Sequence, residues 1–317
     1  MSANYVARRP WAVRLFATWI ACCAMFCAGA DADEPAAPSK STDAAADGPA
    51  ANLKLLTWNI QMLPTALSFA SDSLKKGQAM RAPWIVEYLN ARDYDIVVLQ
   101  EVIDRPITDQ LKAGLKKSYP HQVAFEGRGG VAGCGGGILF ASRIPLKYVA
   151  HIVYEHITGV DKLAEKGCLL VEAECSGVTI QIAGTHLQAG DDATRDQQFV
   201  EMGEKIIAPY RRDGVPQLLV GDMNVATTEE SFPLLLTATE MTAFSLDDAD
   251  PFTVDGHNSW NQPGKRAKHI DHVLLNPRGT NSTILCQTVQ RARRKHEGRT
   301  VDYADHYGVI AEIRIAK

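Results

Sequence analysis

The sequence predicts an α/β fold in which two mixed β-sheets pack face to face and helices lie on the outside. Three observations support this prediction. From residue 53 onward strands and helices alternate, with strands in the majority. One expected strand, residues 94–102, is apolar almost without interruption, which is typical of a strand covered on both faces. The order of elements also falls into two similar halves, each with paired strands and covering helices.

The individual elements follow from apolar periodicity and from turn signals. Helices are expected where apolar residues recur at helical spacing, at 77–92, at 107–119, at about 191–212 and again after residue 225. Strands are expected in apolar stretches that Gly or Ser-Gly signals separate. These stretches are 53–60, 94–102, 135–142, 146–154, 167–175, 178–187, 216–225, 268–276, 283–290 and 308–315.

The N-terminal 30 residues have the features of a secretory signal peptide. Arg8, Arg9 and Arg14 precede a short apolar run that ends in small residues. This run is shorter than the roughly 20 residues that a membrane span needs. Residues 31–51, rich in Ala, Pro, Asp and Ser, have the composition of a flexible linker. We therefore expect an exported protein, periplasmic or extracellular, whose catalytic domain occupies residues 52–317.

Two alternatives stay open for the N-terminal segment, namely a retained membrane anchor and a lipid-modified Cys22 or Cys27. If the segment is cleaved, the loss of its three arginines takes the formal charge from −4 to −7. A mildly acidic exported protein is not an obvious polyanion binder, so nucleic acid is a disfavoured partner.

Cysteines and histidines outside the leader do not form a zinc motif. Four cysteines follow the leader, at positions 134, 168, 175 and 286, and none has zinc-knuckle spacing. A disulfide that links Cys168 or Cys175 to one of the other two is one alternative, and buried free thiols are the other. His269 and His272 are expected on opposite faces of a strand, which argues against a zinc pair.

Polar side chains stand at the ends of otherwise apolar strands. Charged groups at such places are costly unless they are paired or bound. Because several strands share this feature, we expect the groups to meet in one cleft at one edge of the sheets. They are Asn59, Gln100, Glu101, His186, Asp222, Asn224 and Asp271.

The chemical types of these residues fit phosphodiester hydrolysis. Carboxylate and amide oxygens suit a hard cation, Mg²⁺ in the first place, with Mn²⁺, Co²⁺ or Ca²⁺ as alternatives. Asp222 and Asn224 are two residues apart, so an extended strand would place both on one face. Two histidines can take a proton from water and donate to developing negative charge. A metal, a base and such donors are the parts that attack on a phosphodiester requires.

Six segments in order resemble the endonuclease/exonuclease/phosphatase superfamily, to which DNase I-like nucleases and neutral sphingomyelinases belong. They are TWNIQML (57–63), VLQEV (98–102), THLQA (185–189), GDMNV (221–225), HIDHVLL (269–275) and YADHYGV (303–309). The resemblance covers residues 53–315 and implies a four-layered α/β sandwich, which agrees with the pattern of elements.

The resemblance also implies a metal site. Glu101 matches the main metal-ligating Glu, and Asn59 matches an Asn that orients metal and phosphate. Asp305 would lie beside the metal. Ala304 stands where many relatives have a serine, which we expect to tune hydrogen bonding without abolishing activity.

The remaining matches imply catalytic roles. His306 corresponds to the general base, and Asp271 to the Asp that orients it. His186 matches a His that donates to the phosphoryl oxygens. Asp222 and Asn224 match a D-x-N pair close to the metal, the nucleophile and the phosphate.

Three features resemble the sphingomyelinase branch of this superfamily. They are THLQAGDDATRDQQFVEM (185–202), Lys166-Gly167 before a strand, and NIQMLP (59–64) followed by GQAMRAPWIVEYL (77–89). The branch implies a Mg²⁺-dependent phosphodiesterase that cleaves sphingomyelin to ceramide and phosphocholine, acting as a monomer. An extracellular nuclease or phosphoinositide phosphatase of the same superfamily is the alternative, and a non-catalytic binding module is an alternative of another class.

Two basic runs bear on the partner, KRAK (265–268) and QRARRKHEGR (290–299). Each would be a solvated loop, or a contact for an anionic lipid surface or nucleic acid. Secreted haemolytic sphingomyelinases carry an exposed apolar hairpin, whereas the stretch before Asp271 offers only Trp260. Contact with a phospholipid membrane is therefore expected to be peripheral and electrostatic.

Overall fold

The computed structural model describes residues 50–64, 72–125 and 136–317. All of the described residues belong to one compact unit, which lies within Ala45–Lys317. The expected signal peptide, the expected linker up to residue 49 and Cys134 lie outside the described residues. The first strand begins at Ala50, two residues before the expected start of the domain.

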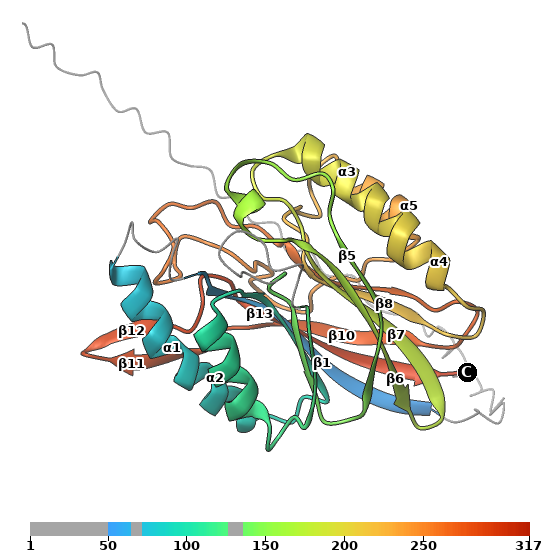
Figure 1. Cartoon of the computed structure of the whole chain (residues 1–317), viewed down its shortest axis with the longest axis horizontal. Helices are drawn as coiled ribbons and strands as arrows, with labels where there is room; N and C mark the ends of the chain where they lie inside the picture. Colours follow the sequence, from blue (N-terminus) through green and yellow to red (C-terminus); the bar gives the residue numbers. More distant parts are fainter. Residues whose placement is uncertain (1–49, 65–71, 126–135) are drawn as a thin grey trace, which may run out of the picture. The chain divides into compact units, whose positions relative to one another are not determined.

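Two mixed β-sheets form the centre of this unit (Figure 1). The six-stranded sheet has the order β10-β13-β1-β2-β4-β3 and the five-stranded sheet the order β5-β6-β7-β8-β9. Strands β1 and β2 run parallel, as do β7 and β8, and the other neighbours are antiparallel. The strands are β1 (Ala50–Met62), β2 (Ile96–Val102), β3 (His121–Ala124), β4 (Leu139–Ser142), β5 (Leu146–Val153), β6 (Gly167–Cys175), β7 (Val178–His186), β8 (Gln217–Asp222), β9 (Asp271–Asn276), β10 (Thr283–Gln290) and β13 (Gly308–Ala316).

Helices cover the outer face of each sheet. On the six-stranded sheet lie α1 (Asp72–Asn90) and α2 (Arg105–Leu115), and on the other lie α3 (Asp192–Met202), α4 (Ala208–Tyr210) and α5 (Phe232–Thr239). A π-helical turn, Gly203–Ile207, interrupts the long helix expected at 191–212. A 3-10 turn spans Gly159–Leu163. None of the described helices is long and apolar enough to cross a membrane.

Alternation along the strands explains the layers. In β2, Ile96 and Val98 face the apolar core between the sheets, whereas Val97 and Leu99 pack under the helices. Both faces of this strand are therefore covered, which is why its sequence reads as a continuous apolar run. A third cluster joins the five-stranded sheet to α3 and α5. The predicted four-layered α/β sandwich is confirmed.

Strand direction brings the polar strand ends to one edge. Parallel pairing aligns Asn59 with Gln100 at the carboxyl ends of β1 and β2. In the other sheet His186 aligns with Asp222, and Asp222 aligns with Asp271 at the start of the antiparallel β9. The carboxyl ends of β1 and β2 therefore lie near the starts of the antiparallel strands β13 and β4. In the same way, the carboxyl ends of β7 and β8 lie at the start of the antiparallel β9.

The basic run at 290–299 forms a β-hairpin and not the solvated loop that was one expectation. Its strands are β11 (Arg293–His296) and β12 (Arg299–Asp302), and the hairpin lies beside α1 (Figure 1). Glu297 and Gly298 at its turn both have positive φ, 48° and 77°, as a two-residue type I′ turn requires. Arg294 pairs with Glu87 of α1 at 3.1 Å.

The three described cysteines after the leader are free thiols. Cys168 and Cys175 are buried, and Cys286 is partly exposed. Burial raises the pKa of the Cys175 thiol to about 11, so it stays protonated at neutral pH. Of the two alternatives for the cysteines, the described residues therefore show free thiols.

The close approach of the two sheets makes Gly184 in β7 a testable position. A Cβ at this residue would lie 2.7 Å from Cε2 of Phe140 and 3.0 Å from Cγ1 of Val98, both in the facing sheet. Gly184→Ala should therefore lower the free energy of unfolding by about 1–3 kcal/mol, measured by urea denaturation. Glu174→Ala, at an exposed position of β6, is the control and should change it by less than about 0.5 kcal/mol. Equal stability of the two variants would contradict this packing.

Candidate active site

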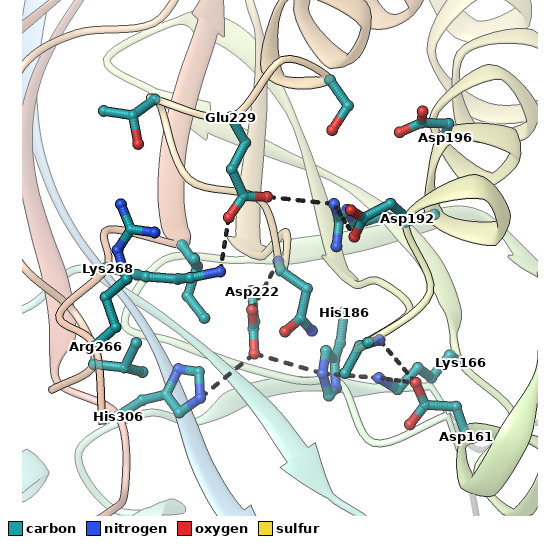
Figure 2. A pocket seen from close by; sticks show the side chains of 18 of the residues that line it. Asp161, Lys166, His186, Asp192, Asp196, Asp222, Glu229, Arg266, Lys268 and His306 are labelled. Carbon is teal, nitrogen blue, oxygen red and sulfur yellow. Dashed lines mark hydrogen bonds and ion pairs between the residues drawn. The ribbon is translucent and has the colours of Figure 1, made fainter. Parts of the chain in front are cut away.

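A cleft of about 1060 Å³ opens where the polar strand ends meet. Its lining includes Glu101, His186, Asp222, Asn224 and His306, from both sheets and from the loop before β13 (Figure 2). Five of the eight site residues predicted from the sequence therefore share one cleft. The other three, Asn59, Asp271 and Asp305, are hydrogen-bonded to this group or to residues beside it.

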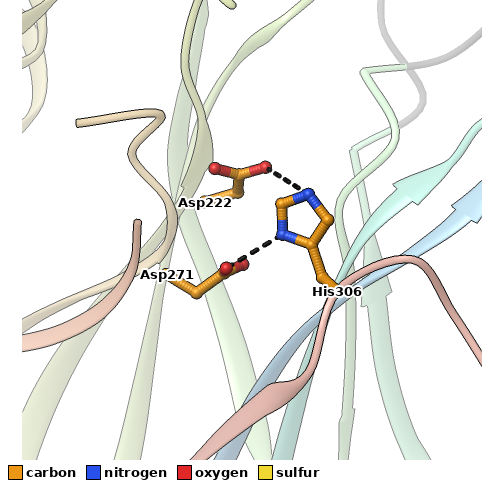
Figure 3. A group of neighbouring side chains, drawn as sticks. All are labelled: Asp222, Asp271 and His306. Carbon is orange, nitrogen blue, oxygen red and sulfur yellow. Dashed lines mark hydrogen bonds and ion pairs between the residues drawn. The ribbon is translucent and has the colours of Figure 1, made fainter. Parts of the chain in front are cut away.

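His306 is held by Asp271. Its Nδ1 donates to Oδ2 of Asp271 at 2.9 Å, and its Nε2 lies 3.8 Å from Oδ2 of Asp222 (Figure 3). Both His306 and Asp271 are buried. The geometry is that of a general base whose ring a carboxylate orients, with Nε2 left for the reaction.

The surroundings of His306 determine its charge. Burial by itself lowers the pKa of this ring, but the carboxylates of Asp271 and Asp222 outweigh burial and raise the pKa to about 10. Ligand atoms of these three residues lie within 4.8 Å of one another and could also hold a metal ion. Because Asp271 already accepts from Nδ1, we favour the base over a metal ligand for His306.

Side chains from distant segments fix the loop that carries Asp305 and His306. The four successive carbonyls from Tyr303 to His306 each accept a hydrogen bond from a different side chain. In order, the donors are Arg81, Asn258, Asn261 and Trp58, at 2.8–2.9 Å. The side chain of Ala304 is buried in the apolar cluster under α1 and α2. The loop is therefore a rigid part of the site.

Asn59 joins the two sheets at the bottom of the cleft. Its Nδ2 donates to Oε1 of Glu101 at 3.1 Å and to Oδ2 of Asp222 at 3.0 Å. Its Oδ1 accepts from the backbone amide of Gln61 at 3.1 Å. In this arrangement the Asn59 amide nitrogen is a donor between two carboxylates, and its oxygen already accepts one hydrogen bond. The predicted metal role of Asn59 stays a prediction.

The carboxylates that remain fit a hard divalent cation. Gln61 donates to Oδ2 of Asp305 at 2.8 Å, whereas Oδ1 of Asp305 is buried without a hydrogen-bond partner among the described residues. Burial and the nearby Asp305 raise the pKa of Glu101 to about 7. A bound cation would relieve the repulsion at the Glu101 carboxylate and give the buried Oδ1 of Asp305 a partner. Glu101 and Asp305 are therefore the residues that would hold Mg²⁺.

Three of the seven described non-glycine residues with positive φ lie at these strand ends. Gln61, Glu101 and Asn224 all have left-handed backbone conformations, with φ of 51°, 56° and 51°. Such a conformation costs a residue other than glycine roughly 1–2 kcal/mol, although Asn tolerates it better. Strain of this kind persists where surrounding contacts over-determine it, as at functional sites. Here it turns the Glu101 side chain toward Asn59.

Lys166 holds His186. The Lys166 ammonium is almost fully buried, lies 3.0 Å from Nε2 of His186, donates to the Leu187 carbonyl at 2.8 Å and pairs with Asp161 at 3.0 Å (Figure 2). Because an ammonium can only donate, Nε2 of His186 accepts. Burial, Lys166 and His306 lower the pKa of His186 well below its ordinary value, so the ring is neutral. In this arrangement Nε2 of His186 accepts a hydrogen bond and does not donate one to a phosphoryl oxygen. The predicted role of His186 as a donor to the phosphoryl oxygens stays untested.

Asn224 completes the predicted set. Its backbone amide donates to Oδ1 of Asp222 at 3.0 Å, and its side-chain amide donates to the Leu187 carbonyl at 2.9 Å. The turn after β8 thereby fixes the Asp222 carboxylate, whose Oδ2 contacts Asn59.

Sequence reasoning missed several supporting residues. Gln61 was detectable from the sequence, because it lies two positions after Asn59 and an expected strand would place both on one face. In the structure its backbone is left-handed instead. Trp58 and Arg81 bond to backbone carbonyls, a role without a sequence pattern. Trp260, considered as a membrane contact, instead donates from Nε1 to the Asp302 carbonyl at 2.7 Å, and Arg81 stacks on its ring.

The expectation that His269 and His272 face apart was wrong. Their ring centroids are 4.3 Å apart, because β9 begins only at Asp271 and His269 precedes its extended geometry. Nε2 of His272 lies 2.8 Å from the Val225 carbonyl, so this nitrogen is already engaged in a hydrogen bond.

The raised pKa of Glu101 predicts a stability signature. With its folded-state pKa about 7 against an ordinary 4.5, metal-free wild-type protein loses stability as the pH rises between these values. Glu101→Gln cannot ionise and escapes this loss. Because the Glu101 side chain is 19% exposed, we expect the variant to be more stable by only about 1–2 kcal/mol at pH 8, and by little at pH 5.

Thermal unfolding of wild-type protein and of Glu101→Gln, each in EDTA and in Mg²⁺, provides the measurement. Mg²⁺ should raise the wild-type Tm at pH 8, because a cation that binds only the folded state stabilises it, and should raise that of Glu101→Gln much less. An equal Mg²⁺ shift in both proteins would remove Glu101 from the metal site. Glu174→Ala again serves as the surface carboxylate control.

Comparisons with known proteins agree with this geometry. The chain is 25% identical over 303 residues to a sphingomyelinase C of Bacillus cereus, which covers 82% of this chain and 88% of the relative. Sphingomyelinase C from Streptomyces griseocarneus superposes with a TM-score of 0.65 at 25% identity, over 83% of this chain and 99% of that one. A Staphylococcus aureus beta toxin mutant with bound magnesium ions does so with a TM-score of 0.68 at 22% identity, over 82% and 99%.

The model of the Endonuclease/Exonuclease/phosphatase family matches residues 56–306. This range includes every strand end that contributes to the cleft, from Asn59 to His306. The chain therefore belongs to the endonuclease/exonuclease/phosphatase family.

Proposed function

We propose that the chain is an exported, Mg²⁺-dependent phosphodiesterase that hydrolyses sphingomyelin to ceramide and phosphocholine. The observation that supports this most directly is the pairing of His306 with Asp271 in a cleft that also contains Glu101 and Asp222. Relatives named sphingomyelinase C, and the beta toxin structure with magnesium, favour this branch. Export rests on the expected leader in residues 1–30.

The chemistry assigns one proton transfer to His306. Positive charge bound at the carboxylates would offset the negative charge that raises the pKa of His306 and so favour the neutral ring. Nε2 of the neutral ring takes a proton from water while the water oxygen forms a bond to phosphorus. The bond between phosphorus and the ceramide oxygen breaks, that oxygen takes a proton from solvent to leave as the ceramide hydroxyl, and His306 then returns its proton to solvent. Asp271 keeps the ring in the tautomer that this step needs, because its carboxylate accepts only from Nδ1–H.

Other residues of the cleft stabilise charge. A divalent cation held by Glu101 and Asp305 would supply positive charge to the phosphoryl oxygens. Lys166 adds a buried positive charge beside His186, on the side of the cleft away from His306 (Figure 2). The Asn59 amide keeps Glu101 and Asp222 together, so both carboxylates are in place before the substrate binds.

The wider cleft suits a zwitterionic headgroup. Figure 2 shows Asp192 and Asp196 on one side of the opening, and Arg266 and Lys268 on the other. Asp192 is paired with Arg195 and Lys268 with Glu229, each at 2.8 Å, so neither side carries a large net charge of one sign. Such a mixed lining suits a ligand with a phosphate and a quaternary ammonium better than an inositol polyphosphate or a nucleic acid. We therefore place the nuclease and the phosphoinositide phosphatase second.

Membrane contact would be peripheral. In the β11–β12 hairpin, Arg293 pairs with Asp302 at 3.5 Å and Arg294 with Glu87 at 3.1 Å, so part of its charge is balanced within the chain. Lys295 and Arg299 are exposed and available to anionic headgroups. The protein would act on the phospholipid surface as a monomer.

Substrate choice can be tested with a panel. Sphingomyelin, lysophosphatidylcholine, plasmid DNA and inositol phosphates are incubated with purified protein and Mg²⁺, and product release is measured. We expect release of phosphocholine from sphingomyelin, loss of activity in EDTA, and recovery with Mg²⁺. Release only from DNA or inositol phosphates would overturn the sphingomyelinase assignment. No hydrolysis of any phosphodiester would favour a binding module.

The base can be tested by substitution. His306→Ala should lower kcat by about 10²–10⁴-fold with an unchanged circular dichroism spectrum. Asp271→Asn should reduce kcat less and shift the acidic limb of the kcat/KM profile to lower pH, because removing this carboxylate lowers the pKa of His306. A Lys295→Ala variant in the hairpin should keep wild-type kcat on a soluble substrate. Near-normal turnover by His306→Ala would exclude it as the base.

A further inference from the structure

We propose that a second, apolar pocket beside the catalytic cleft binds the hydrocarbon chain of the lipid whose phosphodiester is cleaved. This inference rests on the proposed function and deepens it, since it names the part of the substrate that the protein holds besides the headgroup. The pocket is formed by three segments, the turn after β8, the connection after α5 and the residues before β9.

The pocket has the size and lining of a site for an apolar ligand. Its volume is about 630 Å³, within the roughly 300–1,000 Å³ of small-molecule sites. Its apolar lining includes Phe232, Phe244, Leu246, Pro251 and Phe252. A single alkyl chain, which needs no polar partners, matches such a lining.

Phe252 is not explained by the folded core. Phe232 belongs to the cluster under α5, and Phe244 and Leu246 pack against the core between the sheets. Phe252, partly exposed, belongs to none of the hydrophobic clusters of the described residues. An aromatic ring that lines a pocket without packing in a core is available to contact a ligand.

The apolar pocket is continuous with the catalytic cleft. Four residues line both, Thr228, Glu229, Arg266 and Lys268. At this boundary Lys268 pairs with Glu229 at 2.8 Å, and Arg195 approaches the other Glu229 oxygen at 3.4 Å (Figure 2). An amphiphile whose phosphate lies in the catalytic cleft beside His306 could therefore extend its chain across this boundary into the pocket.

The polar groups of the lining include one imidazole ring. His269 lines the pocket, and its Nε2 is buried without a hydrogen bond among the described residues. Burial lowers the pKa of this ring to about 4, so it is neutral at physiological pH and does not repel an apolar chain.

The test uses alkylphosphocholines with chains of four to ten carbons, kept below their micelle concentrations so that no membrane surface contributes. Release of phosphocholine gives kcat/KM for each chain length. In wild-type protein kcat/KM should rise by up to about fourfold per methylene until the pocket is filled. Phe252→Ala should flatten this dependence and leave kcat/KM for the butyl compound within about twofold of wild type.

Controls separate this inference from the proposed function. Leu285→Ala, at a 51% exposed position of the edge strand β10, should behave as wild type. Phe252→Leu provides a milder variant, and it should give an intermediate dependence. Hydrolysis of butylphosphocholine without any chain-length dependence would overturn the pocket while the proposed function stands.

Binding measurements cover the case in which no alkylphosphocholine is hydrolysed, which would count against the proposed function itself. Calorimetric titration of the same series should then still show tighter binding with chain length in wild type and a weaker dependence in Phe252→Ala. Equal affinity for decylphosphocholine and decyl glucoside would contradict a chain site coupled to the phosphate.

Discussion

Like charges gathered at one edge of the sandwich constrain the whole site. Glu101, Asp222, Asp271 and Asp305 reach this edge from both sheets and from the loop before β13. Carboxylates held so close raise one another's pKa unless positive charge or donors compensate them. The raised pKa values of Glu101 and Asp222, each caused first by burial and then by a neighbouring carboxylate, show the compensation to be incomplete.

Neighbouring side chains donate hydrogen bonds that offset part of the negative charge of these four carboxylates. Asn59 donates to two of them, Gln61 to a third, and His306 to the fourth. Two buried oxygens of these carboxylates still have no hydrogen-bond partner among the described residues, Oδ1 of Asp271 and Oδ1 of Asp305. A divalent cation held by Glu101 and Asp305 would satisfy the second of them. The same excess of negative charge keeps the pKa of His306 high, so cation binding and the readiness of the base are physically linked.

Rigid support is the second requirement of this arrangement. The loop that carries Asp305 and His306 would be free to move if its backbone polar groups faced only water. Side chains from three other segments instead bind four of its successive carbonyls. The two basic stretches that might have bound a polyanion are partly used within the chain, Arg294 on α1 and Lys268 on Glu229. The free charge near the cleft is thus mixed in sign, in keeping with a zwitterionic headgroup.

In the proposed function, the apolar pocket and the cleft would bind the chain and the headgroup of one lipid molecule side by side. The Glu229–Lys268 pair stands between a polar and an apolar compartment. Such a boundary separates the headgroup from the chain without a large exposed hydrophobic surface.

The sequence by itself determined the layers, because a strand buried on both faces must be apolar throughout and β2 shows this directly. It also placed Glu101, His186, Asp222, Asp271 and His306 at strand ends, where no core would choose them. Only the tertiary structure decided which atoms meet. Lys166 donates to Nε2 of His186, so that this nitrogen is an acceptor. The Asn59 side-chain nitrogen donates to the Glu101 carboxylate, and residues of the run at 290–299 pair as a β-hairpin. Periodicity gives the face of a residue, whereas the direction of a hydrogen bond depends on partners that lie far away in the chain.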